Sequence, residues 1–513
     1  MSVPIKRALF SLDVCADAVL SGDRLKKMGW RIIATGETAR ELRKRGVGAE
    51  DVSSFVGIRR AYRIPPTLHP KIEEALTLDV PYRIDLVFDI PYRLSKGNDV
   101  GGRTLLALGA KGKRIVVFNS EDMRRVIKGL ESDPSHRTIP ACLHEELIDK
   151  AHAHIARHYL TLAQRAKESP YDGSIGKAAL RLANGENPYQ VPADLFVEET
   201  ADNLSFEKFQ LLSGRPCFTN IADVDCISHT LCLAAAAFQK RYRKAPYIAI
   251  ASKHGNPCGM GADWRSPDEA VRRALFGNPA ALWGGEFIAN FRIDNNLGAI
   301  LLKSAARKRL LKDAYWMLDV IAAPEFDAPA LELLSGRSAR KIFQNRALFD
   351  PRVKKSRWHY RHIRGGFLRQ PSPSYVLDIS APGRNAPRLP QEVIDSLIIA
   401  WSVAYSSFHG GNEIALAKGR QLLAVGGGPS TVDAARRAIE RSRENAHDAD
   451  RSVFAADAFF PFLDAPRVLQ KGGCRFGVVP SGGKREPLIQ EFFRKNRMKV
   501  VSISAEFRGF YRH

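Results

Sequence analysis

The stretch "RALFSLDVCADAVLSGDRLKKMGWRIIATG", residues 7–36, decides the fold class of this chain. Its pattern predicts a strand over 7–13, an amphipathic helix over 18–29 and a second strand over 31–36. Further apolar runs between residues 84 and 120 continue the alternation of strands and helices. Strands joined by helices of this length run parallel. We therefore predict an α/β protein that begins with a doubly wound parallel sheet.

The whole chain has 513 residues, too many for one ordinary hydrophobic core. We expect a first domain over 1–135 and a polar, helical linker over 136–180. The linker ends in the turn-rich stretch "SPYDGSIGK". Strand and helix patterns then resume over 181–513, where the Pro-rich stretch "APGRNAPRLP" predicts a division near residue 385.

Composition narrows the class of protein. No apolar run approaches the roughly 18 residues that a membrane span needs, and the first residues lack the apolar core of a signal peptide, so we expect a cytoplasmic protein without membrane partners. Seven scattered cysteines argue against a disulfide framework and a thiolate zinc site. The net charge of +23 attracts anions. Nucleic acid fits this charge, although a compact basic tail and a nucleic-acid-binding motif are lacking, and anionic small substrates such as nucleotides or folates explain a basic cleft equally well.

Histidines cluster in "HEELIDKAHAHIARHYL", residues 144–160. His154 and His158 lie four residues apart on a predicted helix, with His152 nearby, and so could be metal ligands. The HExxH pattern is absent, which favours a solvated helix face. We therefore expect no metal.

Each of two loops that follow apolar strands allows two interpretations. In "ATGETA", residues 34–39, backbone amides and the hydroxyls of Thr35 and Thr38 suit a phosphate, but an N-capped helix fits as well. The glycine run of "LAVGGGPST", residues 423–431, is consistent with an anion loop or a simple turn.

Two other stretches place polar groups in unusual surroundings. In "FAADAFFPF", residues 454–462, Asp457 is either a buried partner for a planar ring or a helix N-cap beside a hydrophobic wall. In "ASKHGNPCGMG", residues 251–261, Lys253 and His254 are either a catalytic pair on a loop at a strand end or an ordinary surface dipeptide.

Six motifs occur in an order that resembles one family, the bifunctional AICAR transformylase/IMP cyclohydrolases. They are "TLHPK" (67–71), "GENPYQ" (185–190), "TNIADVD" (219–225), "KHGNPCG" (253–259), "AADAFFPF" (455–462) and "FRGFYRH" (507–513). The resemblance implies a methylglyoxal-synthase-like first domain and a transformylase region of two cytidine-deaminase-like subdomains, 181–385 and 386–513, without zinc. It also implies a homodimer with transformylase sites at the subunit interface.

The resemblance further implies formyl transfer from 10-formyltetrahydrofolate to the 5-amino group of AICAR, giving FAICAR, followed by cyclisation to IMP. The amine is a poor nucleophile because its lone pair is delocalised, so the transfer needs proton removal and charge stabilisation. By resemblance, Lys253 and His254 do this with the help of Asn412, and Asp457 lies on the folate side.

The same resemblance supplies the remaining candidate residues. For cyclisation it implies a tyrosine, an aspartate and a lysine, which correspond to Tyr92, Asp99 and Lys111. The positions that match its substrate-binding motifs are Thr35, Gly36, Thr38, Asn187, Asn220, Phe462, Arg508 and Phe510. A two-residue insertion displaces the family's Arg-Tyr that contacts the nucleotide, and Arg181 is the candidate that replaces it.

The chain also departs from the family pattern. The lysine of the family's "RVKTLHP" is Pro66, a lysine of its "SVSDK" loop is Cys15, Glu37 adds a negative charge to "STGGT", and "KSNA" becomes "GGNE". These changes leave two alternatives: a paralogue that acts on a modified aminoimidazole in specialised metabolism, and a non-catalytic descendant that binds nucleotides or RNA. The four retained transfer residues argue against the second alternative.

Overall fold

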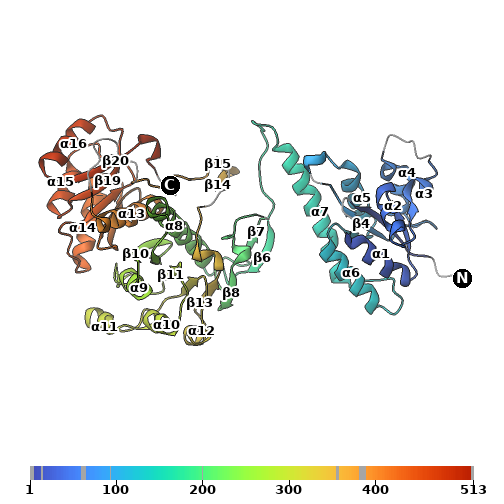
Figure 1. Cartoon of the computed structure of the whole chain (residues 1–513), viewed down its shortest axis with the longest axis horizontal. Helices are drawn as coiled ribbons and strands as arrows, with labels where there is room; N and C mark the ends of the chain where they lie inside the picture. The colour runs from blue at the N-terminus through green and yellow to red at the C-terminus, as the bar shows by residue number, and fades with distance from the viewer. Residues whose placement is uncertain are drawn as a thin grey trace. The chain divides into compact units, whose positions relative to one another are not determined.

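The computed structural model describes residues 5–12, 16–58, 65–92, 94–198, 200–353, 358–379 and 389–509. The chain forms two compact units, Met1–Ile175 and Gly176–His513, coloured blue to cyan and green to red in Figure 1. Both combine helices with sheets that contain parallel strands, which confirms the predicted α/β class.

The first unit contains a five-stranded parallel sheet in the order β3-β2-β1-β4-β5. Its strands alternate between two cores: Phe10 points into one and Leu9 into the other. The strand order reverses at β1, so the crevice at the carboxyl ends of β1 and β4 is the expected ligand position. The strands are β1 Arg7–Leu12, β2 Arg31–Ala34, β3 Glu50–Asp51, β4 Leu86–Ile90 and β5 Ile115–Val117.

Helices cover both faces of this sheet. They are α1 Ala16–Lys27, α2 Gly36–Lys44, α3 Val52–Val56, α4 Pro70–Thr77, α5 Val100–Lys111, α6 Ser120–Ser132 and α7 Ala141–Ala163. Helix α7 falls within the segment predicted as a linker, yet Leu143, Leu147 and Ala151 are buried in the core of the first unit. The helix is therefore an integral part of that unit.

The histidines of α7 correct the predicted solvated face. His158 is buried, with Nδ1 3.2 Å from an Arg103 guanidinium nitrogen and Nε2 2.9 Å from the Asn98 carboxamide oxygen. His154 stacks on Phe118, with ring centroids 4.3 Å apart. Burial, aided by the Arg103 charge, lowers the pKa of His154 to about 4. These two histidines are packing residues.

The second unit contains an eleven-stranded mixed sheet in the order β20-β19-β18-β16-β17-β10-β9-β11-β12-β13-β8. Its strands are β8 Gln210–Ser213, β9 Tyr247–Lys253, β10 Asn256–Asp263, β11 Glu286–Ala289, β12 Val320–Ala323, β13 Lys341–Gln344, β16 Asn412–Lys418, β17 Gln421–Gly428, β18 Val453–Ala456, β19 Phe476–Pro480 and β20 Lys499–Ile503. Two separate hairpins are β6 Lys177–Arg181 with β7 Asp194–Val197, and β14 Trp358–Ile363 with β15 Gly366–Pro371.

This large sheet consists of two similar halves. Each has a long helix, a hairpin, a helix that packs on the hairpin, an antiparallel third strand and two further parallel strands. The halves meet where β10 pairs antiparallel with β17. The division predicted near residue 385 lies outside the described residues. The helices are α8 Phe218–Tyr242, α9 Pro267–Leu275, α10 Asn295–Leu302, α11 Ala305–Leu311 and α12 Ala328–Ser335 in the first half, and α13 Gln391–Ser406, α14 Thr431–Glu444, α15 Asp464–Lys471 and α16 Glu486–Lys495 in the second.

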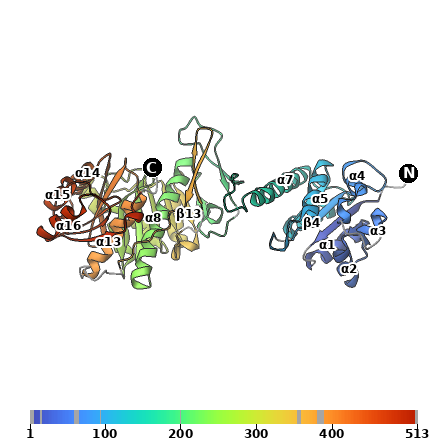
Figure 2. The same cartoon turned by 90° about the horizontal axis from the view of Figure 1, so that it is seen from above.

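The long helices α8 and α13 lie side by side in both views (Figures 1 and 2) and contact each other. Within the described part of the chain, α8 is the one helix long and apolar enough to cross a membrane by length and composition. In its most apolar window 72% lies buried within the protein. Its buried side chains belong to the largest core of the second unit.

Glycines allow a helix to approach the second hairpin strand in both halves. A Cβ at Gly259 of β10 would lie 1.8 Å from the carbonyl oxygen of Ala274 in α9, and one at Gly426 of β17 would lie 2.1 Å from that of Ala434 in α14. The glycine run at 426–428 therefore belongs to a strand covered by a helix, and Pro429 and Ser430 form the turn that leads into α14.

We predict that Gly259→Ala and Gly426→Ala each lower the free energy of unfolding by about 3 kcal/mol, because the helix backbone must move away from the strand. Gly366→Ala is the control, since a Cβ there meets nothing within 4 Å, and it should change stability by less than about 0.5 kcal/mol. Urea unfolding followed by circular dichroism measures all three variants. Equal stabilities would contradict this account of the packing.

Candidate active site

The turn between β9 and β10 presents the two residues at the centre of "ASKHGNPCGMG". Lys253 ends β9, and His254 and Gly255 have φ values of 53° and 68°, as a two-residue hairpin turn requires. A Cβ at Gly255 would lie 2.8 Å from the Cys226 sulfur and 3.1 Å from an Asp223 carboxylate oxygen. The turn is thus packed on the first turns of α8, which carry the "TNIADVD" motif.

Strand directions bring residues from both halves to the same edge of the sheet. Because β10 is antiparallel to β17, and β16 is antiparallel to both β17 and β18, the β9–β10 turn, the start of β16 and the end of β18 share one edge. Lys253, His254, Asn412 and Asp457 all lie there. Asn256 links the halves: its Nδ2 donates to the carbonyl of His254 at 3.3 Å, and its Oδ1 accepts the Phe408 amide at 2.7 Å.

Backbone carbonyls hold the Lys253 ammonium. Its Nζ donates to the carbonyl oxygens of Trp283 at 2.8 Å and Gly284 at 2.7 Å. An ammonium has three hydrogens, so one remains to stabilise negative charge on a bound molecule. Nearby, Ser252 donates to the buried carboxyl of Glu286 at 2.8 Å. Burial, reinforced by the charge of Asp223, raises the pKa of Glu286 to about 8.

Asp457 is a buried carboxyl group at this edge. Its Oδ1 accepts the backbone N–H of Glu413 at 2.9 Å, and its Oδ2 has no hydrogen-bond partner among the described residues. Burial raises the pKa of Asp457 to about 8, and the charge of Glu413 acts in the same direction. The helix α15 begins only at Asp464, so the N-cap interpretation of Asp457 is wrong. Protonated at neutral pH, Asp457 can donate a hydrogen bond.

Aromatic rings and arginines flank Asp457. The Arg508 guanidinium lies 5.3 Å from the centre of the Phe459 ring, and that of Arg485 lies 4.9 Å from the Phe462 ring. The amide of Gly509 donates to the carbonyl of Asp457 at 3.1 Å, which fixes Arg508 beside it. Phe510 lies outside the described residues.

The sequence interpretation did not include His409 and Glu413. His409 donates its backbone N–H to one carboxylate oxygen of Glu413, and its Nδ1 lies 2.8 Å from the other. Glu413 is buried at the start of β16. A signal was available, because a glutamate within the apolar run "NEIALA" needs a partner when the strand is buried.

Two of the predicted binding residues make local hydrogen bonds near the start of α8. The Asn220 carboxamide oxygen accepts the Cys217 amide at 3.1 Å, which caps the helix. The Asn187 amide donates to the Gln190 carboxamide oxygen at 2.7 Å. The loop that contains Asn187 is tied to α8, because the amide of Phe218 donates to the carbonyl of Asn184.

Arg181 lies away from these groups in the chain, on the β6–β7 hairpin. Its Nε forms an ion pair with Asp194 at 3.0 Å. The side chain keeps 61% of its surface exposed.

In the first unit, predicted residues gather at the carboxyl edge of the parallel sheet. Thr38 accepts the amide of Leu12 at 3.2 Å, and its hydroxyl lies 3.0 Å from that of Thr35, which precedes Gly36 at the start of α2. The Thr35 side chain does not cap α2. Tyr92 follows β4 and donates to the carbonyl of Asn98 at 3.2 Å. Asp99 caps α5 by accepting the Gly102 amide at 2.9 Å.

Lys111 does not join this group. It ends α5, about 18 Å along the helix from Asp99, and its Nζ lies 4.0 Å from a Glu73 carboxylate oxygen. The structure thus separates Lys111 from Tyr92 and Asp99 within one chain. It adds instead Asp89, a buried residue of β4 whose pKa burial raises to about 7. A Cβ at Gly102 would lie 2.5 Å from its Oδ2.

Comparison with known proteins identifies the family of this chain. The family model described as "AICARFT/IMPCHase bienzyme" matches residues 111–441. The chain belongs to this family. The resemblance drawn from the six motifs is therefore confirmed.

Several relatives of known name align with this chain over nearly their full length. "Bifunctional purine biosynthesis protein PurH" of Persephonella marina is 26% identical, covering 97% of this chain and 98% of that protein. The protein of the same name from Aquifex aeolicus is 26% identical over 93% and 94%, and that from Acidithiobacillus ferrooxidans 27% over 94% and 95%. A solved structure, "Crystal structure of ForH", matches 30% of this chain and 95% of its own at 25% identity, with a TM-score of 0.27.

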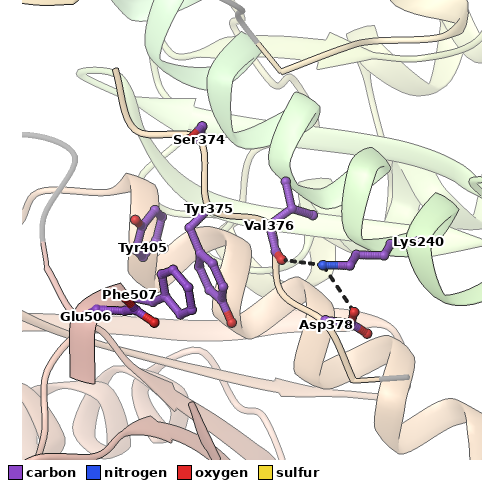
Figure 3. Close-up of a pocket in the computed structure, with 8 residues that line it drawn as sticks. All are labelled: Lys240, Ser374, Tyr375, Val376, Asp378, Tyr405, Glu506 and Phe507. Carbon is purple, nitrogen blue, oxygen red and sulfur yellow. Dashed lines mark hydrogen bonds and ion pairs between the residues drawn. The ribbon is translucent and has the colours of Figure 1, made fainter. Parts of the chain in front are cut away.

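Figure 3 shows a cavity of about 630 Å³ in the second unit of this AICARFT/IMPCHase member. The Tyr375 and Phe507 rings stack with centroids 4.0 Å apart, and the Lys240 ammonium reaches the carbonyl of Val376 and the Asp378 carboxylate. None of the predicted site residues lines it.

Within the described ranges, no three His, Cys, Asp or Glu side chains are grouped so as to hold a metal ion.

We predict a pH-dependent stability difference between the wild type and Asp457→Asn. In the unfolded chain Asp457 ionises near pH 4, but its pKa in the folded state is about 8, so folding binds a proton between these values. The contribution of Asp457 to stability therefore falls as pH rises from about 4 to about 8. The stability of the wild type minus that of Asp457→Asn should fall over this range and level off above it.

Urea unfolding between about pH 5 and about pH 9 measures this difference. Asp448→Asn is the control, because Asp448 is exposed and its ion pair with Lys418 lowers its pKa. That variant should differ from the wild type by a constant amount over the same range. A constant difference for Asp457→Asn as well would show that Asp457 is ionised in the folded protein.

Proposed function

We propose that this protein transfers the formyl group of 10-formyltetrahydrofolate to the 5-amino group of AICAR, giving FAICAR in purine biosynthesis. The observation that carries the proposal is the convergence of Lys253, His254, Asn412 and Asp457 on one edge of the large sheet. These residues lie far apart in the sequence and come from both halves of the unit. Membership of the AICARFT/IMPCHase bienzyme family supplies the reaction.

The properties of each group suit one part of this chemistry. Attack of the amine places negative charge on the formyl oxygen, where the remaining N–H of Lys253 can stabilise it. His254 projects from the exposed turn beside it. The Nδ2 of Asn412 donates to the carbonyl of Pro429 at 3.2 Å, which orients its carboxamide. Asp457, protonated at neutral pH, can donate to the folate ring, and Phe459 and Phe462 offer apolar faces to it.

The family also suggests finer features of the assembly. The co-substrate is 10-formyltetrahydrofolate, and the chemistry proposed requires no metal. The two similar halves of the second unit support a pair of cytidine-deaminase-like subdomains, 181–385 and 386–513, and the parallel sheet supports a methylglyoxal-synthase-like first domain. We expect a homodimer, and assign substrate contacts to Arg181, Asn187, Asn220, Phe462, Arg508 and Phe510.

Cyclisation of FAICAR to IMP is the proposed second activity, located in the first unit. The carboxamide nitrogen must attack the formyl carbon and water must leave, which calls for groups that move protons. Tyr92 and Asp99 lie at the carboxyl edge of the parallel sheet, as do Thr35, Gly36 and Thr38 at the start of α2. A helix start with free amides suits the phosphate, whereas Glu37 opposes it and favours a substrate that carries less charge.

We predict that single substitutions separate the two activities. His254→Ala should lower formyl transfer from 10-formyltetrahydrofolate to AICAR by roughly 10² to 10⁴-fold, because proton transfer and charge stabilisation contribute on this scale. It should leave the cyclisation of preformed FAICAR unchanged. Tyr92→Phe should lower cyclisation and leave formyl transfer unchanged. Tetrahydrofolate release and the absorbance of IMP report the two steps.

Assays of the wild-type protein with several amines identify the substrate. A panel of AICAR, its dephosphorylated nucleoside and ring-altered amines separates the purine biosynthetic enzyme from a relative that acts on a modified aminoimidazole. Formyl transfer to no member of the panel, at high enzyme concentration, would rule out the proposed activity. Steeply salt-dependent RNA binding without turnover would instead favour a nucleic-acid-binding protein.

A further inference from the structure

The pair formed by His409 and Glu413 lies at the edge that carries Lys253 and His254. Asn412 begins β16 at this edge and directly precedes Glu413, so the pair lies at the same edge as Asn412. The amide of Phe408, next to His409, donates to the side chain of Asn256, which also binds the carbonyl of His254. One asparagine thus joins the loop of His409 to the turn of His254.

Glu413 fixes the orientation of the His409 ring. Its Oε2 lies 2.8 Å from His409 Nδ1 and also accepts the Ser407 hydroxyl at 3.3 Å, while its Oε1 accepts the His409 backbone amide. The carboxylate is 1% exposed, so water does not compete for these bonds. A ring nitrogen that donates to a carboxylate leaves the other nitrogen of the imidazole as a base.

The second ring nitrogen of His409, Nε2, is available to accept a proton. Among the described residues Nε2 has no hydrogen-bond partner, and it is not one of the buried unpartnered atoms. The side chain is 18% exposed, so it is covered on most sides but reaches the surface. His254 differs, because its ring is exposed and has no carboxylate that orients it among the described residues. A buried carboxylate thus orients His409 and not His254.

Neighbouring residues leave room for the His409–Glu413 pair and hold it in place. A side chain at Gly427 would clash with His409, since a Cβ there would lie 2.5 Å from the His409 Cβ and 2.7 Å from Glu413 Oε1. Glycine at this position of β17 therefore makes room for the pair. Asp457 lies behind Glu413 and accepts its backbone amide. Burial and the charge of Glu413 both raise the pKa of Asp457, which reduces the repulsion between the two carboxyl groups.

We propose that His409, oriented by Glu413, is a further catalytic residue of the formyl transfer site. The amine nitrogen bonds to the formyl carbon and gives one proton to His409 Nε2. The bond between the formyl carbon and N10 then breaks, and the same imidazolium returns the proton to N10 of tetrahydrofolate. This assignment rests on the proposed function. It gives proton transfer to His409 and leaves stabilisation of the oxyanion to Lys253 and His254; Glu413 is a positioning residue.

The test compares full-length variants with saturating AICAR and 10-formyltetrahydrofolate. We expect His409→Ala to lower kcat by roughly 10² to 10⁴-fold and to leave both KM values nearly unchanged. Added imidazole should restore part of the lost rate, because it supplies the missing base. His152→Ala is the control, since His152 is exposed on α7 of the first unit; it should match the wild type with and without imidazole.

Glu413→Gln tests the positioning role. Glu413 receives the backbone N–H and the Nδ1–H of His409 on two different oxygens. In glutamine one of these oxygens becomes an NH2 group, which donates and cannot accept. We expect kcat to fall on the order of 10²-fold with KM unchanged, and no rescue by imidazole, because His409 still fills the space. Circular dichroism and thermal unfolding of each variant exclude simple misfolding.

The outcomes separate the two proposals. A wild type that transfers formyl to no amine defeats the proposed function and this inference with it. An active wild type with a His409→Ala variant that keeps kcat within about threefold defeats this inference alone. So does a folded His409→Ala variant that imidazole fails to rescue while it rescues His254→Ala, because His254 would then be the base.

Discussion

The antiparallel pairing of β10 with β17 is the interaction on which the second unit depends. It joins two similar halves into one sheet and sets their strands in opposite directions. As a result, a turn of the first half, at His254, meets the beginning of β16 and the end of β18 in the second half. Neither half alone contains the complete group of polar residues at this edge.

The close approach of helices to this sheet depends on the absence of side chains. Gly259 and Gly426 let α9 and α14 lie directly on the second hairpin strands, and Gly427 leaves space for His409 and Glu413. Adjacent glycines of β17 thus serve different purposes, because Gly426 allows the helix to pack and Gly427 makes room for the His409–Glu413 pair. A substitution here would be expected to damage both stability and activity, because backbone atoms have little freedom to move aside.

Buried carboxyl groups recur near the ends of the strands. Asp457 and Glu286 in the second unit and Asp89 in the first all have pKa values raised by burial. Burying an acid costs free energy unless it is neutral or well paired. A neutral carboxylic acid is a hydrogen-bond donor at pH 7, which a solvated aspartate is not. Burial therefore changes what these side chains can offer to a ligand.

The sequence by itself determined the α/β class and the family, because hydrophobic periodicity and motif order can be read directly from the chain. It also predicted the pair Lys253–His254. Tertiary structure decided the rest. It buried His158 and joined His409 to Glu413. The physical reason is that burial and hydrogen bonding depend on which strands become neighbours, and that neighbourhood is set by sheet order and direction, which no short stretch of sequence encodes.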